Sequence, residues 1–367
     1  HAGQGGGHMK GKMRAQVFYE PGEMRLESVD IPGVQAHQVL VRVRACGICG
    51  SDVAYYYGKS PLDTPDGKGP LILGHEFSGE VAAVGELPSA LGLFAPGDRV
   101  LANPVQNCNA CPECARTQVH LCRNLRVSGV SVNGAFAEYA LVNYTHLHKI
   151  PEGVSFEQAA LCEPLACACY GVKKLDVQMG DHVAIFGPGT IGLMMVRLIR
   201  ARGAGSITMI GTNDYALKKA GAMGADLVLN TRSQDSPFYC ADVARAVEAR
   251  FGALSDRVIV PTAAEEALQG ALEISGRGAT IVYFGLPGSD TVLKVPLLKT
   301  LTMDKSILVS WLAPFTWDAA LKALRDHVVD AASLVTHRYP LQALQEGIEM
   351  MHDRARPEKT KAMVLID

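Results

Sequence analysis

Hydrophobic and polar residues alternate with a period of two along parts of residues 13–160, which is typical of half-buried strands. The segment QVLVRVRA, residues 38–45, shows this alternation, and PGDRVLA, residues 96–102, places a turn before a strand. HEFSGEVAAVG, residues 75–85, ends in a glycine turn. We therefore predict that residues 13–160 form an all-β unit.

The pattern changes near residue 160, where apolar runs begin to alternate with helical segments. The apolar runs are HVAIF, SITMI, ADLVLN, DRVIV and ATIVYFG, and helices are expected from about Thr190, through Ala220, over Val243–Phe251 and over Glu265–Ile274. This rhythm predicts a parallel sheet with helices on both faces. After about residue 305 the pattern returns to mixed structure and ends on the strand-like KAMVLID.

Length and charge set the general class. A chain of 367 residues is expected to form two domains. A net charge of −2, without a block of one sign, argues against nucleic acid or an anionic membrane as the partner. No apolar run approaches the ~18 residues of a membrane span and no signal segment opens the chain, so we expect a cytoplasmic protein. We set residues 1–12, which begin HAGQGGGHM, aside as the remnant of an expression tag.

Four cysteines lie close together at Cys108, Cys111, Cys114 and Cys122, with gaps of two, two and seven residues. In a reducing compartment such a cluster is more often a metal site than a disulfide framework, and four thiolates suit a structural tetrahedral Zn²⁺. A redox pair remains an alternative. A zinc ribbon for nucleic acid is disfavoured, because the loop carries one arginine, Arg116, and no aromatic residue for stacking.

The segment AIFGPGTIGL carries glycines at Gly187, Gly189 and Gly192, after a predicted strand and at the start of a predicted helix. In this context the glycines permit a tight turn, close approach of the backbone to a pyrophosphate, and packing of the helix on the strand. With Pro188, Thr190 and Ile191 they form a candidate dinucleotide site at a helix N-terminus.

The end of the next predicted strand bears on the choice of coenzyme. Gly211, Thr212 and Asn213 stand there instead of the carboxylate that usually binds the ribose of NAD. A small residue leaves room for a 2′-phosphate, which Thr212 and Asn213 could bind. Asp214 would repel that phosphate and no arginine is adjacent in the sequence. We therefore favour NADP and keep NAD as the alternative.

Further motifs occur in a recognisable order. These are GICGSD at 47–52, GHEFSGEVAAVG at 74–85, GDRV at 97–100, the cysteine loop, GAFAEY at 134–139, CEPLA at 162–166 and GPGTIG at 187–192. From Met13 onward the chain resembles the zinc-dependent medium-chain dehydrogenases, within them the sorbitol (polyol) and threonine dehydrogenase branch. The resemblance implies a GroES-like β-barrel catalytic domain, residues 13–163 and 306–367, with an inserted Rossmann domain, residues 164–305.

The resemblance also implies a second, catalytic zinc. Cys49 and His75 would bind it together with either Glu76 or Glu163, and Glu163 stands where other alcohol dehydrogenases have a second cysteine. Ser51 would accept the proton of the substrate hydroxyl, and Asp52 would orient His75. Relatives commonly carry a histidine three positions after this serine, but this chain has Ala54.

The expected activity is therefore interconversion of a secondary alcohol and a ketone by hydride transfer to NAD(P), with a polyol, sugar or cyclitol as the small-molecule substrate. A threonine-type amino alcohol dehydrogenase is the alternative, and a dinucleotide-binding protein without catalysis is a third hypothesis. Trp311 is a candidate for the pocket wall, with core packing as the alternative. By analogy we expect a homodimer or homotetramer.

Overall fold

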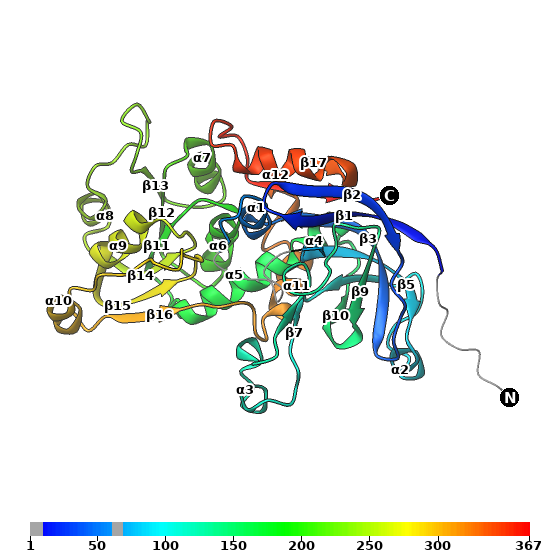
Figure 1. Cartoon of the computed structure of the whole chain (residues 1–367). Helices are drawn as coiled ribbons and strands as arrows, with labels where there is room; N and C mark the ends of the chain where they lie inside the picture. Colours follow the sequence, from blue (N-terminus) through cyan, green and yellow to red (C-terminus); the bar gives the residue numbers. More distant parts are fainter. Residues whose placement is uncertain (1–9, 61–68) are drawn as a thin grey trace.

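The computed structural model describes residues 10–60 and 69–367, which form two lobes (Figure 1). Residues 1–9 of the expected tag lie outside the described residues. Strand β1, Lys12–Glu20, begins inside the segment 1–12 that we set aside. Lys12 pairs there with Asp30 across the β1–β2 ladder, so this residue belongs to the fold.

The first lobe contains a seven-stranded and a three-stranded sheet. The larger has the order β10-β6-β5-β3-β18-β17 with β9 also on β3, and the smaller has the order β2-β1-β4. Their bounds are β2 Glu23–Asp30, β3 Gln38–Ile48, β4 Leu71–Ile72, β5 Glu76–Val84, β6 Arg99–Ala102, β9 Tyr139–Asn143, β10 Leu147–Lys149, β17 Val335–Pro340 and β18 Lys361–Leu365. Strand β18 pairs antiparallel with β3, so the C-terminal segment returns to the first lobe.

Short helices interrupt this lobe, so the prediction of an all-β unit over residues 13–160 is wrong in detail. The helices are α1 Gly50–Tyr56, α2 Glu86–Ala90, α3 Pro112–Ala115 and α4 Phe156–Ala160, with 3-10 turns η1 Val119–Leu121 and η2 Tyr144–His146. Helix α1 begins because the Asp52 carboxylate accepts the backbone N–H of Cys49 at 2.8 Å, which caps the first turn. Local capping thus overrides the strand pattern.

The second lobe is a six-stranded parallel sheet of order β13-β12-β11-β14-β15-β16. Its strands are β11 His182–Phe186, β12 Ser206–Gly211, β13 Leu227–Asn230, β14 Ser255–Val260, β15 Ser275–Tyr283 and β16 Ser306–Val309. Its helices are α5 Cys162–Leu175, α6 Thr190–Ala201, α7 Asp214–Ala222, α8 Val243–Phe251, α9 Glu265–Ile274 and α10 Leu297–Thr302. The predicted alternation of strands and helices, and the Rossmann architecture, are confirmed.

Strand β16 bears on the expected domain boundary at residue 305. It lies just past that boundary, yet pairs in parallel with β15, from Thr280↔Ser306 to Tyr283↔Val309. Its four residues therefore belong to the second lobe, because their backbone hydrogen bonds are made in the parallel sheet of that lobe. The remaining elements are α11 Trp317–Arg325, η3 Ala332–Leu334, η4 Leu341–Ala343 and α12 Leu344–His352.

A continuous core joins the two lobes. Helix α5 packs on α6, on α11 and on the parallel sheet, and Leu165, Ile185 and Leu193 are fully buried in one cluster with Ala45 of β3.

Within the part of the chain that the structure describes, no helix combines the length and the apolar character that crossing a membrane requires.

Candidate metal centres and coenzyme cleft

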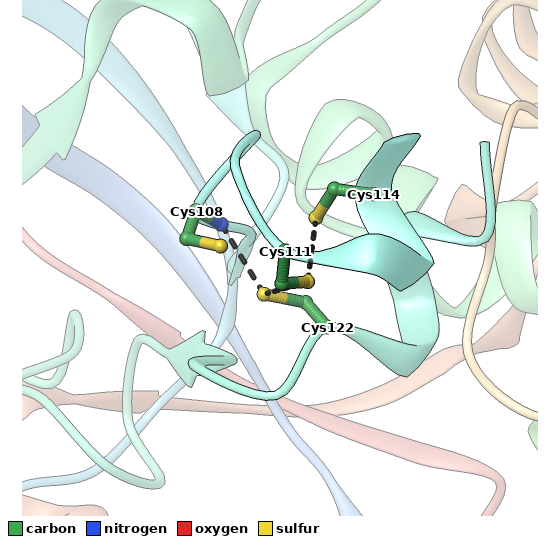
Figure 2. Close-up of side chains that lie close together, drawn as sticks. All are labelled: Cys108, Cys111, Cys114 and Cys122. Atoms are coloured by element: carbon green, nitrogen blue, oxygen red, sulfur yellow. Dashed lines mark hydrogen bonds between the residues drawn. The ribbon is translucent and has the colours of Figure 1, made fainter. Parts of the chain in front are cut away.

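The four cysteines of the 2-2-7 motif come together in a loop that projects from the first lobe (Figure 2). We call residues 107–125 the cysteine lobe. It is closed by the antiparallel pairing of β7, Val105–Gln106, with β8, Arg126–Val127. Helix α3 and η1 carry the ligands Cys114 and Cys122 into place.

Their sulfurs form a group suited to a metal. All four Sγ atoms lie within 4.8 Å of one another, with Cys111 Sγ 3.5 Å from Cys114 Sγ and 3.9 Å from Cys122 Sγ. Backbone N–H groups of Ala110 and Cys111 lower the pKa of Cys108 to about 6, which favours the thiolate that a metal needs. The donor set and its spacing fit a tetrahedral zinc.

A second ligand group contains Cys49, His75 and Glu76, whose ligand atoms also lie within 4.8 Å of one another. Cys49 is the N-cap of α1, immediately after β3. His75 immediately precedes β5, and Glu76 is the first residue of that strand, paired with Gly47. The β3–β5 ladder therefore holds the three candidate ligands together at one end of these two strands. The ring nitrogen His75 Nδ1 is buried without a hydrogen-bond partner among the described residues.

Charged neighbours surround this group. Asp52 Oδ1 lies 3.6 Å from His75 Nδ1, just beyond hydrogen-bond length. Burial opposes a charge on His75, but Asp52 and Cys49 outweigh it and raise the pKa of His75 well above its usual value. On the other side, Lys361 Nζ lies 2.5 Å from Glu76 Oε2, with both side chains buried. Gly47 makes this pair possible, because a Cβ there would lie 2.1 Å from Glu76 Oε2.

Glu163 lies in the first turn of α5, outside the 4.8 Å group. Its carboxylate accepts the thiol of Cys167 at 3.7 Å, one helical turn further on. Burial, opposed by His75, raises the pKa of Glu163 to about 7. The structure thus places Glu76 in the candidate ligand group and Glu163 outside it.

A cavity of about 40 Å³ connects Glu163 to the cysteine lobe. Its wall includes the polar or aromatic residues Asn103, Asn107, His120, Glu163, Cys167 and Trp317. Trp317, which the sequence analysis missed, lines this cavity, whereas Trp311 does not and is 37% exposed. His120 was also missed, although its position two residues before Cys122 places it in the cysteine lobe. Ser51 is half-buried in the first turn of α1.

The cleft between the lobes has a volume of about 1120 Å³. Gly187, Pro188 and Gly189 line one side, and Met351 and Thr360 of the C-terminal segment line the other. The hydroxyl of Thr190 donates to the carbonyl of Thr360 at 2.8 Å and so links the walls.

The glycine loop has the packing that a pyrophosphate site needs. A Cβ on Gly192 would lie 2.0 Å from the Gly187 carbonyl oxygen, so only glycine permits the helix to start there. A Cβ on Gly189 would meet no atom within 4 Å, which leaves its backbone open to a ligand. Ile191 packs against the core behind the loop.

Gly211, Thr212 and Asn213 line the cleft at the end of β12. Asn213 is already engaged, because its Oδ1 accepts from Ala216 N at 3.2 Å and its Nδ2 donates to Pro357 O at 2.9 Å. Asp214 Oδ1 accepts from both Asn230 and Ser236 at 2.6 Å, and Asp214 is not among the residues that line the cleft. Arg232, distant in the sequence, lines the cleft instead.

Comparison with known proteins agrees with this geometry. Residues 35–152 match the alcohol dehydrogenase GroES-like domain, and residues 190–326 match the zinc-binding dehydrogenase family. The chain is 33% identical over 344 residues to sorbitol dehydrogenase of Bacillus subtilis, covering 92% of this chain and 93% of the relative. It is 33% identical over 349 residues to L-threonine 3-dehydrogenase of Symbiobacterium thermophilum, covering 92% and 94%.

A zinc-binding dehydrogenase from Sinorhizobium meliloti 1021, solved bound to NADP, superposes with a TM-score of 0.88 at 28% identity, covering 97% of this chain and 99% of that one. The chain belongs to the zinc-dependent medium-chain dehydrogenase family, in its sorbitol and threonine dehydrogenase branch. It is an oxidoreductase of the alcohol dehydrogenase class.

Proposed function

We propose that this enzyme interconverts a secondary alcohol of a polyol, sugar or cyclitol and the corresponding ketone, with NADP as the preferred coenzyme. The observation that carries the proposal is the candidate ligand group Cys49, His75 and Glu76, in a chain that also has a small cavity lined by Glu163 and a cleft lined by the glycine loop. The named activities of relatives such as sorbitol dehydrogenase support this substrate class.

The composition of the cavity supports a polyol over threonine. Asn103, Asn107 and His120 supply neutral hydrogen-bonding groups. Among the described residues that line the cavity there is no lysine or arginine, so the carboxylate of an amino acid would lack a cationic partner.

Two zinc ions per chain are proposed, one in the cysteine lobe and one held by Cys49, His75 and Glu76. When bound, the second ion supplies Lewis-acid chemistry that makes a substrate hydroxyl easier to deprotonate. Asp52 stabilises the start of α1 through the Cys49 N–H, and its carboxylate faces His75. Ser51, on the same turn, is positioned to accept the hydroxyl proton. Glu163 faces the substrate cavity and completes its polar floor.

Support for NADP comes from the β12 end of the cleft. Gly211 leaves space at the position where NAD enzymes place a carboxylate. Asp214, which would repel a 2′-phosphate, is directed to Asn230 and Ser236. Arg232 is an exposed guanidinium in the same cleft and provides the cation that a 2′-phosphate requires.

We further propose that the chain assembles into a homodimer or a higher homo-oligomer in the cytoplasm. Ten free thiols fit a reducing compartment. Strand β16 is an edge of the parallel sheet, and α10 beside it exposes apolar side chains, among them Leu298 at 78%. A second copy would cover both the strand edge and this apolar surface.

The test measures reduction of the coenzyme by zinc-loaded protein, monitored through the near-ultraviolet absorbance of the reduced coenzyme. NAD⁺ and NADP⁺ are each offered with polyols, sugars, cyclitols and threonine. We expect turnover with polyols and a higher kcat/KM with NADP⁺. Turnover with threonine alone would refute the substrate class.

The ligand assignment is tested by zinc analysis of variants. Cys49→Ala and Glu76→Ala should lose one zinc per chain and all activity. Glu163→Gln should lose activity while keeping both ions. Loss of a zinc from Glu163→Gln, with retention in Glu76→Ala, would reverse the assignment of the third ligand.

A further inference from the structure

The cysteine lobe docks on the same face of α5 that carries Glu163. Its residue His120, in η1, contacts the ring of Tyr170 edge-on, with centroids 5.8 Å apart and planes at 67°. Glu163, Cys167 and Tyr170 are spaced four and three residues apart, so they lie along one face of α5. The cysteine lobe and the candidate catalytic centre therefore share one wall of side chains.

The small cavity lies at this junction. Asn107, Val119 and His120 of the cysteine lobe form one side of it, and Glu163 and Cys167 of α5 form the other. At about 40 Å³ the cavity admits the hydroxyl-bearing end of a substrate and no large apolar group. A substrate that occupies this cavity would therefore contact both Glu163 and the cysteine lobe.

His120 has a free hydrogen-bonding atom at this place. Its Nδ1 is buried and has no hydrogen-bond partner among the described residues. A neutral imidazole ring carries one donor and one acceptor nitrogen, so it can pair with either atom of a hydroxyl group. A buried nitrogen without a partner is unfavourable, and a substrate hydroxyl would provide one.

We propose that His120 is a specificity-determining residue, which hydrogen-bonds a non-reacting hydroxyl of a polyhydroxylated substrate and is held in position by the folded cysteine lobe. This proposal rests on the proposed polyol activity. It gives the cysteine lobe a part in substrate selection, beyond holding the fold together. Asn107 reinforces the geometry, because its Nδ2 donates to Cys114 Sγ at 3.7 Å and so ties the cavity wall to the metal-binding sulfurs.

The test compares a polyol with a simple alcohol that has the same reacting group. Sorbitol and butan-2-ol are each oxidised with the preferred coenzyme by wild type, His120→Phe and His120→Gln. Phenylalanine keeps the ring and removes the nitrogens, so kcat/KM for sorbitol should fall by about 10-fold to 100-fold. With butan-2-ol, which has no second hydroxyl, kcat/KM should change by less than about 3-fold. Glutamine, which can still donate and accept, should recover part of the loss with sorbitol.

A binding measurement supports the kinetics. The dissociation constant of sorbitol for the complex with reduced coenzyme, followed by coenzyme fluorescence, should rise in His120→Phe by a similar factor. His37→Phe is the matched control, because His37 is an exposed histidine of the first lobe outside the cavity. Zinc content and thermal stability of each variant show whether the cysteine lobe remains folded.

The outcomes separate this inference from the proposed function. An equal loss with sorbitol and butan-2-ol, or no loss with either, in a correctly folded variant overturns the role of His120 and leaves the polyol activity standing. A wild-type enzyme that oxidises neither polyols nor butan-2-ol overturns both.

Discussion

At the scale of single residues, Glu76 shows how a buried charge depends on a distant partner. Its carboxylate begins β5, and its cationic neighbour Lys361 begins β18 near the end of the chain. Both are almost fully buried. A buried ion pair contributes little over apolar residues of similar size, but an unpaired buried charge is strongly destabilising.

We therefore predict that Lys361→Met lowers the stability of the zinc-free enzyme by about 3–5 kcal/mol, because the Glu76 carboxylate would remain buried without its partner. The double variant Glu76→Gln with Lys361→Met should recover most of that loss. Thermal unfolding of four proteins, namely the wild type, Lys361→Met, Glu76→Gln and the double variant, measures the coupling as a double-mutant cycle. If the double variant is as unstable as the sum of the single ones, the two side chains do not interact.

Arg232 carries the second prediction at this scale. Arg232 follows β13 and is far from Gly211 in the sequence, so the sequence alone does not indicate that both residues line the same cleft. Arg232→Ala should weaken NADP⁺ by about 10-fold and leave NAD⁺ within about 2-fold, because only NADP⁺ carries the 2′-phosphate. Titration of each coenzyme into the protein checks this, with Arg197→Ala on α6, outside the cleft lining, as the control. Equal weakening of both coenzymes would contradict a phosphate contact.

At the scale of elements, the cysteine lobe has little apolar core of its own, and α3 and η1 are single turns. Such a segment depends on its metal for stability. Cys111→Ser should therefore bind one zinc per chain less than wild type and unfold at a lower temperature, while the second lobe still binds coenzyme. Metal analysis and thermal unfolding test this. Unchanged stability and full zinc content would rule out the cage.

At the scale of the whole molecule, one face of the coenzyme lobe remains apolar and exposed. Leu297, Leu298 and Leu301 on α10, together with Val309 on β16, are each at least 65% exposed. Contiguous exposed apolar residues beside an unpaired strand edge are typical of an interface between proteins.

We predict that Leu298→Glu with Leu301→Glu converts the oligomer into monomers, because two buried carboxylates would oppose association. Light scattering coupled to size-exclusion chromatography measures the mass. Met179→Glu is the control, since Met179 is 93% exposed in a turn outside α10 and β16. A variant that keeps the wild-type mass would show that this face is not the interface.

Much of the fold followed from local pattern. The period-two alternation, the alternating strands and helices, and the glycine loop from Gly187 to Gly192 depend on neighbouring residues, and the structure confirms the Rossmann sheet and the helices Val243–Phe251 and Glu265–Ile274. The cysteine group was also visible, because its ligands lie within one short loop. Helix α1 was missed because its start depends on capping by Asp52. Strand β16 was assigned to the first lobe, past the expected boundary at residue 305, because only its pairing with β15 shows where so short a strand belongs.

The amino-acid sequence by itself determined the family motifs, the four-cysteine group and the glycine loop, since each is a short-range arrangement of side chains with specific chemistry. Only the tertiary structure decided that Glu76 lies with Cys49 and His75 and forms an ion pair with Lys361. It also decided that Asp214 binds Asn230 and Ser236, that Arg232 lines the cleft, and that His120 lines the small cavity. These contacts join residues far apart in the chain. They arise from the pairing of strands and the packing of loops that are distant in the sequence, which no local pattern encodes.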